Sequence, residues 1–183
     1  TRQPISIVRG RGARVYDLEG REYLDFVGGI AVNVLGHGHP DLVQAIQRQA
    51  AQLIHTSNLY YTEPQVQLAK TLVEHSFADR VFFCNSGAEA NEAALKFARR
   101  YWHTLGESRT EIIALEESFH GRTFGALSVA SDEHYRGPFA PLLADVKWVP
   151  VNDPSALAKA VTPRPASAAR SGANGANLFP CPG

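Results

Sequence analysis

Cysteine is scarce in this sequence, with two residues in 183. Cys84 lies in an apolar run and Cys181 stands between prolines, so their spacing indicates neither a disulfide framework nor a zinc site. The sequence also lacks a run of about 18 apolar residues that could cross a membrane, and its first residues lack the charged-then-apolar order of a signal peptide. We therefore expect no metal site, no membrane association and a cytoplasmic location.

An excess of charge of either sign is also missing, because 18 Lys and Arg residues balance 18 Asp and Glu residues. No run of basic residues marks a surface for nucleic acid. The sequence contains neither Gly-x-Gly-x-x-Gly nor Gly-Lys-Ser/Thr, the glycine-rich motifs of nucleotide-binding loops. The expected partner is a small molecule or another protein, and a nucleotide-binding domain is the weakest alternative.

Apolar residues are plentiful enough for a core, since 44% of the residues are hydrophobic. Residues 14–17 and 22–26 are rich in Val, Tyr, Leu and Phe and flank a turn that contains Gly20, which predicts a hairpin. Helices are predicted to begin at Pro40 and at Pro64, because apolar residues recur after each at helical spacing. Both helices are expected to be half buried.

Strands and helices alternate in the middle of the chain. Apolar runs over 81–84 and 112–115 predict buried strands, residues 146–149 are a third strand candidate, and helices are predicted over 88–101 and near 155–161. This alternation is typical of a sheet covered on both faces, so the predicted fold class is α/β. The side chains expected to face inward from the helix over 88–101 are Ala90, Ala94, Phe97 and Tyr101.

The order breaks at residues 162–183, which are mostly Ala, Pro, Gly, Ser, Arg and Asn, with only Leu178 and Phe179 as large apolar residues. Such a segment buries too little apolar surface to offset the entropy lost on ordering, so it is predicted to be disordered. Its composition is also typical of GC-rich DNA read in the wrong frame. We therefore expect this tail not to be the natural continuation of the protein.

The turn Ser86-Gly87-Ala88 connects the predicted strand over 81–84 directly to a helix. Such a turn directs free backbone N–H groups and the positive end of the helix outward, and a glycine lets an anion approach closely. The turn could therefore bind a phosphate. Ser86 and Glu89 also have the spacing of a capping box, which needs no ligand. The sequence pattern leaves both interpretations open.

A second cluster, Phe119-His120-Gly121-Arg122, follows the predicted strand over 112–115, where open α/β sheets bind their ligands. Its aromatic ring could stack on a flat ring, and its guanidinium could bind a carboxylate. The alternative is a structural loop in which Phe119 fills the core and His120 caps a helix.

Two further segments carry polar residues without a clear chemical pattern. His37 and His39 have no set of carboxylates or thiols around them that would complete a metal site, so a glycine-rich turn before a helix is the favoured interpretation. Asn33 follows a glycine-rich loop, and Ser57 lies in a polar and aromatic connector.

Four motifs follow one another along the chain, and their order and spacing are specific. They are Asp17-Leu18-Glu19-Gly20 with Tyr23-Leu24-Asp25-Phe26, then Gly36-His37-Gly38-His39-Pro40, then Asn85-Ser86-Gly87-Ala88-Glu89-Ala90-Asn91-Glu92-Ala93-Ala94 with Lys96, and Phe119-His120-Gly121-Arg122. From about Pro4 to about Val161 the sequence resembles the class III aminotransferases, fold type I enzymes that use pyridoxal 5′-phosphate. Segments 28–33 and 55–65 are most similar to acetylornithine and succinylornithine aminotransferases.

The resemblance implies the first part of such an enzyme. Residues 1–55 would be the N-terminal segment of the small domain, and 56–161 part of the large cofactor-binding domain with three α/β/α layers. The implied activity transfers an amino group from N-acetylornithine or a related ω-amine to 2-oxoglutarate in arginine biosynthesis, by a homodimer. The implied cofactor-binding residues are Ser86, Gly87, Ala88, Phe119 and His120, and the implied substrate-binding residues are Arg122, Asn33 and Ser57.

A transaminase also needs a lysine that bonds to the cofactor and an acidic residue at its pyridinium nitrogen. Lys70, Lys96, Lys147 and Lys159 do not stand in the family's lysine motif, and the family's acidic motif is absent as well. The chain by itself is therefore expected to be inactive. The alternative is a non-enzymatic half-domain that binds a phosphate ligand or pairs with a full-length partner in a regulatory role.

Overall fold

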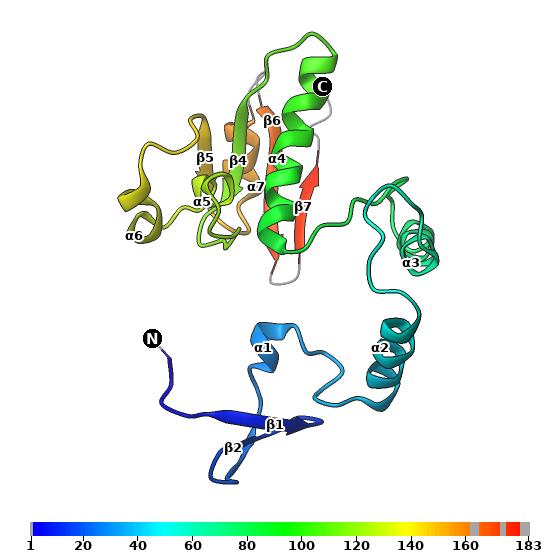
Figure 1. Cartoon of the computed structure of the whole chain (residues 1–183). Coiled ribbons are helices and arrows are strands. Elements are labelled where there is room, and N and C mark those ends of the chain that lie inside the picture. Colours follow the sequence, from blue (N-terminus) through cyan, green and yellow to red (C-terminus); the bar gives the residue numbers. More distant parts are fainter. Residues whose placement is uncertain (1, 162–164, 173–174, 180–183) are drawn as a thin grey trace. The chain divides into compact units, whose positions relative to one another are not determined.

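The computed structural model describes residues 2–161, 165–172 and 175–179. The chain divides into two compact units, residues 1–81 and 82–183 (Figure 1). This division falls later than the boundary predicted after residue 55. The difference arises because the chain between 56 and 81 forms a helix with its connections and contributes no strand to the larger sheet.

The first unit contains a small antiparallel sheet in the order β1-β2-β3. Strands β2 (Arg14–Asp17) and β3 (Glu22–Leu24) form the predicted hairpin, which is therefore confirmed. Strand β1 (Ile7–Arg11) pairs with β2 and was not predicted. Its only adjacent apolar residues, Ile7 and Val8, are followed by Arg, Gly and Arg, so the sequence has no alternating pattern there.

The hairpin turn is held by the buried carboxylate of Asp17. Its Oδ2 accepts hydrogen bonds from Arg21 Nε at 2.7 Å and from the Tyr23 hydroxyl at 2.8 Å, and its Oδ1 accepts one from the Arg21 N–H at 2.8 Å. Burial alone would raise the pKa of Asp17, but the hydrogen bonds and the Arg21 charge outweigh burial and lower the pKa. An ion pair between the buried Asp17 and the exposed Arg21 thus closes the turn.

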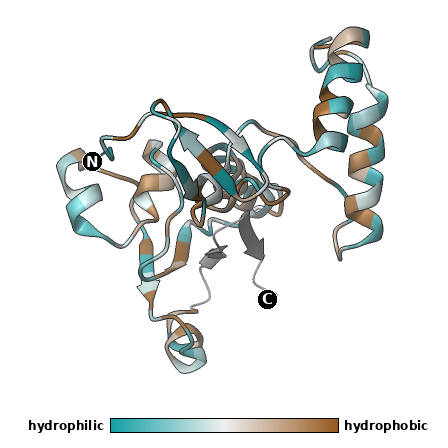
Figure 2. Ribbon diagram, turned by 90° about the horizontal axis from the view of Figure 1, so that it is seen from below, coloured by the Kyte–Doolittle hydropathy of each residue, from teal (hydrophilic) through white to brown (hydrophobic). Residues whose placement is uncertain are grey.

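Three helices complete the first unit: α1 (Gly28–Ala31), α2 (Pro40–Gln52) and α3 (Glu63–Glu74). The helices predicted to begin at Pro40 and Pro64 are confirmed. The prediction that both are half buried is wrong, because neither contains a buried residue. Figure 2 shows hydrophobic and hydrophilic residues alternating along both helices. Each is amphipathic, and the described chain provides little to cover its apolar side.

The second unit is built on a four-stranded sheet in the order β5-β4-β6-β7. Strands β4 (Glu111–Leu115) and β5 (Val146–Val149) pair in parallel, which confirms both predicted strands and the α/β class. Ile112, Ile113 and Ala114 are all buried, so β4 is covered on both faces as a continuously apolar run requires.

Helix α4 (Gly87–Thr104) lies along β6 and β7 (Figure 1). Its buried residues are Asn91, Leu95 and Trp102, whereas Phe97 and Tyr101 are 55% and 52% exposed. The side of α4 that was predicted to face the core is therefore wrong, because the buried residues lie part of a turn away from it. The prediction had placed the large apolar side chains of Phe97 and Tyr101 in the core. Phe97 instead packs edge-on against Phe82, with ring centroids 5.3 Å apart.

The remaining helices of the second unit are short: α5 (Phe124–Ser128), α6 (Glu133–Arg136), the 3-10 helix η1 (Gly137–Phe139) and α7 (Pro154–Ala160). The helix predicted near 155–161 is confirmed as α7. Residues of α5 are buried between α4 and the chain that follows, and α7 contacts β5.

Residues 81–84 are not a strand, which corrects the prediction for this apolar run. Phe82 and Phe83 are both exposed. A strand needs a neighbour to satisfy its backbone N–H and C=O groups, and within the described ranges no strand pairs with this segment. An apolar run shows that a segment suits a sheet, but the partner decides whether a strand forms.

Two strands lie in the segment that was predicted to be disordered. Strand β6 (Pro165–Gly172) pairs in parallel with β4, and β7 (Gly175–Phe179) pairs antiparallel with β6. Backbone hydrogen bonds form this ladder, and they do not depend on large apolar side chains, which is why composition did not reveal it. Residues 162–164, 173–174 and 180–183 of the predicted tail lie outside the described residues.

We predict that Ile113→Ala lowers the free energy of unfolding by about 2–5 kcal/mol, because it leaves a cavity in the centre of β4. Ile113 is 1% exposed. Urea denaturation followed by circular dichroism measures the change. The control Val151→Ala removes a half-exposed side chain and should change stability by about 0.5 kcal/mol or less. Equal losses for the two variants would contradict the assigned core.

Candidate functional site

The amino end of α4 forms one side of the candidate site. Ser86 precedes the helix with extended backbone, at φ −154° and ψ 160°, and Gly87 is the first helical residue. The first hydrogen bond of the helix joins the Ala90 N–H to the Ser86 carbonyl at 3.0 Å. The N–H groups of Gly87 and Ala88 therefore precede the helical ladder and have no acceptor among the described residues.

The capping box that the sequence allowed is present. Ser86 Oγ accepts a hydrogen bond from the Glu89 N–H at 3.2 Å, and Glu89 Oε2 accepts one from the Asn85 N–H at 2.7 Å. Hydrogen bonds from the Asn85 side chain and backbone lower the pKa of Glu89. The capping box uses the backbone N–H groups of Asn85 and Glu89 and leaves those of Gly87 and Ala88 available. Capping and anion binding are therefore compatible at this turn.

Space is open at residues 86–88, which we call the phosphate-binding turn after the role that the sequence predicts for them. A Cβ atom added at Gly87 would meet no atom within 4 Å. The Gly87 Cα therefore borders a region that a side chain could fill or an anion could enter. A helix terminus with unused donors and a favourable dipole suits a dianionic phosphate, so these residues fit the phosphate of pyridoxal phosphate.

The aromatic and basic cluster lies directly against this turn. Gly121 has φ +127°, and a Cβ atom there would fall 2.7 Å from the Ala88 Cβ. The buried Asn91 side chain donates from Nδ2 to the His120 carbonyl at 2.6 Å. The structure therefore brings two predicted segments, 86–88 and 119–122, into contact although 30 residues separate them in the sequence.

Arg122 and Phe119 present their side chains at the surface. Phe119 is 64% exposed, so it does not fill the core as the structural alternative required. The Arg122 guanidinium carbon lies 5.1 Å from the Phe119 ring centroid and 4.0 Å from that of Tyr135. No carboxylate of the described chain forms an ion pair with Arg122. A guanidinium held between aromatic rings and free of internal carboxylates can bind an external one.

The His120 side chain is buried, unlike those of Phe119 and Arg122. It is 2% exposed, and neither ring nitrogen has a hydrogen-bond partner among the described residues. Burial lowers the pKa of His120, and the Ser118 backbone only partly opposes this shift. Burial therefore favours the neutral form of the ring, and its role toward a cofactor stays a prediction.

Asn33 lies in the first unit, after a left-handed turn. Gly28, Gly29, Ile30 and Ala31 all have positive φ, and the Asn33 N–H donates to the Gly28 carbonyl at 2.8 Å. The turn fixes the backbone at Asn33.

Ser57 lines a cavity of about 350 Å³ in the first unit, together with His55, Asn58 and Gln65. Ser57 has φ +62°, and its Oγ accepts a hydrogen bond from the Leu59 N–H at 3.2 Å. The polar lining is consistent with a binding role for this connector. The substrate-binding roles of Ser57 and Asn33 remain predictions.

His37 does have a carboxylate partner, which the linear sequence concealed. Its Nε2 lies 2.7 Å from Asp25 Oδ2, while Asp25 Oδ1 accepts a hydrogen bond from the Gly28 N–H at 2.8 Å. The hydrogen bond from His37, followed by that from Gly28, lowers the pKa of Asp25. In the described part of the chain, no group of three or more His, Cys, Asp or Glu side chains could hold a metal ion.

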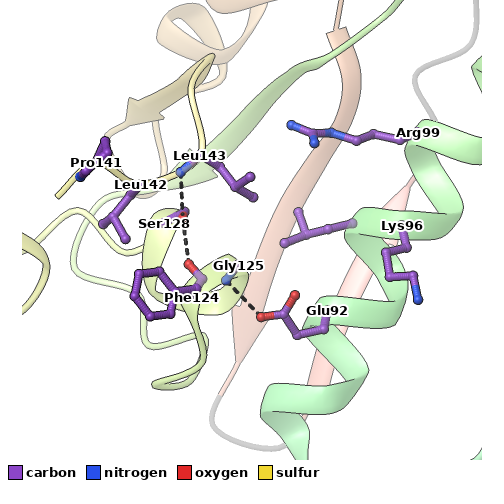
Figure 3. Close-up of a pocket in the computed structure, with 10 residues that line it drawn as sticks. Glu92, Lys96, Arg99, Phe124, Gly125, Ser128, Pro141, Leu142 and Leu143 are labelled. Carbon is purple, nitrogen blue, oxygen red and sulfur yellow. Dashed lines mark hydrogen bonds between the residues drawn. The ribbon is translucent and has the colours of Figure 1, made fainter. Parts of the chain in front are cut away.

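Glu92 is a residue that sequence reasoning did not single out. Its Oε1 accepts hydrogen bonds from the N–H groups of Gly125 and Ala126 at 2.8 and 3.1 Å, and from Thr123 Oγ1 at 2.5 Å. Glu92 also borders a cavity of about 380 Å³, together with Arg99, Phe124 and Leu142 (Figure 3). No local signal marks this role, because the partners lie more than 30 residues away.

None of the four lysines is placed as part of the phosphate-binding turn. Lys147 on β5 pairs with Glu111 at 2.8 Å, and Lys70 on α3 pairs with Glu74 at 3.8 Å. Lys96 borders the cavity beside Glu92, and Lys159 is in the last turn of α7.

Within the described ranges, no helix is both long and apolar enough to span a bilayer.

The model of the class-III aminotransferase family matches residues 1–170. Over 161 residues the chain is 57% identical to an acetylornithine aminotransferase of Caldanaerobacter subterraneus subsp. tengcongensis, which covers 87% of this chain and 41% of the relative. It is 53% identical over 167 residues to an acetylornithine aminotransferase of Methanocaldococcus jannaschii, covering 91% and 42%. The chain thus spans about two fifths of these curated relatives.

Solved structures of aminotransferases also match this chain. The ornithine aminotransferase of Toxoplasma gondii matches with a TM-score of 0.85 at 31% identity, covering 92% of this chain and 41% of that one. The N-acetylornithine aminotransferase of Stenotrophomonas maltophilia K279a matches with a TM-score of 0.71 at 40% identity, covering 87% and 39%. These matches confirm the fold expected from the sequence resemblance.

We predict that Gly121→Ala destabilises the second unit more than Gly106→Ala does. Both glycines have positive φ, which costs about 1–3 kcal/mol for another residue, but only at Gly121 would the new Cβ atom clash with Ala88. Urea unfolding of the two variants measures the difference. Equal losses would show that the contact between Gly121 and Ala88 relaxes easily.

Proposed function

We propose that this chain, which belongs to the class-III aminotransferase family, supplies part of a pyridoxal-phosphate enzyme of arginine biosynthesis. The proposed reaction transfers an amino group from N-acetylornithine, or a related ω-amine, to 2-oxoglutarate. The observation that carries the proposal is the contact between the phosphate-binding turn and the Phe119–Arg122 segment, made through Gly121 and Asn91.

The residues of this contact suit the cofactor and a carboxylate substrate together. Gly87 and Ala88 would hold the phosphate through their N–H groups, and the exposed Phe119 ring would lie against the pyridine ring. Arg122, free of internal carboxylates, would bind the α-carboxylate of the amino acid. When bound, the cofactor supplies the electron sink that the amino-group transfer requires.

The remaining parts of the site are proposed to come from elsewhere in the enzyme. No lysine in the described part of the chain is placed to bond to the cofactor, so the 183-residue chain alone is expected to be inactive. Asn33 and Ser57 are proposed to contribute to substrate binding. A homodimer is proposed because the family resemblance implies one, and the exposed apolar sides of α2 and α3 support it. A cytoplasmic location is also proposed from the sequence.

A hybrid enzyme makes these roles testable. It consists of the C. subterraneus acetylornithine aminotransferase with residues 1–161 of this chain in place of the homologous segment. Transamination of N-acetylornithine, compared with succinylornithine and 4-aminobutyrate, tests the proposed donor. A hybrid that binds the cofactor and yet transfers no amino group from any of these donors would contradict the proposed function.

We predict that Gly87→Val in the hybrid enzyme weakens pyridoxal phosphate binding about tenfold or more, since a branched side chain would occupy the open space where the phosphate approaches. A Cβ atom at this position meets no protein atom, so the fold should be retained. Absorbance titration of the apoenzyme gives the affinity, and circular dichroism checks the fold. Unchanged affinity in a folded variant would refute the phosphate-binding role.

We predict that Arg122→Ala raises KM for N-acetylornithine and 2-oxoglutarate much more than it weakens cofactor binding. The substitution removes a charged hydrogen-bond partner that contributes about 1.5–3 kcal/mol. Steady-state kinetics together with a cofactor titration separates the two effects. Equal losses of substrate and cofactor affinity would count against the assignment of Arg122 to the carboxylate.

A further inference from the structure

The segment that contains Arg122 is attached to α4 on its amino-terminal side by Asn91. The Asn91 side chain is buried, and its Nδ2 donates to the His120 carbonyl at 2.6 Å. This bond is itself shielded from water, and leaving a buried carbonyl without a donor would be costly. The backbone two residues before Arg122 is therefore fixed to the helix that begins at the phosphate-binding turn.

On its carboxyl-terminal side the same segment is attached by Glu92, the next residue of α4. The Glu92 carboxylate accepts from Thr123 Oγ1 at 2.5 Å and from the Gly125 N–H at 2.8 Å, and Figure 3 shows the latter bond. A Cβ atom at Gly125 would fall 2.3 Å from Glu92 Oε2, so a side chain there would displace the carboxylate. The carboxylate binds the chain immediately after Arg122.

Arg122 thus lies between two anchors from adjacent residues of one helix. Its own side chain is exposed and contacts only aromatic rings among the described residues. A long exposed side chain loses considerable rotamer entropy when it binds a ligand, and a fixed backbone removes one part of that cost in advance. The anchors also fix the distance between Arg122 and the phosphate-binding turn.

We propose that Asn91 and Glu92 are positioning residues that set Arg122, through the backbone on either side of it, for the substrate carboxylate. This inference rests on the role proposed above for Arg122. If Glu92 served only to cap the short helix α5, its loss would lower stability without a selective effect on carboxylate binding.

The test uses Glu92→Ala in the hybrid enzyme. We expect KM for 2-oxoglutarate and the Kd of glutarate, an unreactive dicarboxylate, to rise about tenfold, because misplacing a binding group by about 1 Å is costly. Glutarate binding is measured by calorimetry with and without the cofactor. Pyridoxal phosphate affinity should stay within about twofold, since the capping box and the Gly87 and Ala88 N–H groups are untouched.

Three further variants make the result specific. Glu92→Gln keeps an acceptor oxygen and should restore most of the glutarate affinity, whereas Thr123→Val removes one anchor bond and should weaken glutarate binding about threefold even if Glu92→Ala does not fold. The matched control Glu107→Ala removes the surface pair with Arg109 and should leave both affinities unchanged. In the double variant with Arg122→Ala, loss of Glu92 should add little.

The outcomes separate this inference from the proposed function. If Arg122→Ala weakens glutarate binding while Glu92→Ala and Thr123→Val leave it unchanged, the positioning role is wrong and the function of Arg122 stands. If Arg122→Ala itself has no effect on glutarate binding, the proposed carboxylate site is wrong, and the inference falls with it. Equal loss of glutarate and cofactor affinity in Glu92→Ala would indicate a general structural role and overturn the inference.

Discussion

The hydrogen bonds from Asn91 and Glu92 to the segment after β4 are the interactions on which the candidate site depends. They join the helix that begins with Gly87 to the loop that carries Phe119 and Arg122. Ala88 and Gly121 meet so closely that only glycine fits at 121. Together with the core, these contacts join a helix terminus with unused N–H donors to an exposed arginine, two features that are distant in the sequence.

The sheet below the site has the complementary role of a rigid support. The buried strand β4 leads directly into the segment with Phe119 and Arg122, so the position of that segment follows from the core. In open α/β sheets, ligands bind beyond the carboxyl ends of the strands, where loops and helix termini converge. Here the convergence consists of the loop after β4 and the first turn of α4, and the donors left over by the capping box face the same region.

The first unit shows how a polar network can hold a small sheet. The buried Asp17 carboxylate closes the hairpin, and the His37–Asp25 pair holds the glycine-rich turn beside it. Gly36 packs against Gly12, where a Cβ atom would fall 2.9 Å from a carbonyl oxygen. By contrast, α2 and α3 expose apolar side chains that a stable enzyme would cover, which agrees with a chain that spans about two fifths of its relatives.

The sequence by itself determined the hairpin, helices α2, α3, α4 and α7, strands β4 and β5, the family and the candidate residues at 86–88 and 119–122, because these depend on local periodicity and on short motifs. Only the tertiary structure decided which face of α4 is buried, that residues 81–84 form no strand, and that β6 pairs with β4 and β7 with β6. It alone revealed Glu92 and the partner of His37. Each of these depends on a contact between residues distant in sequence, and neither spacing nor composition encodes the identity of such a partner.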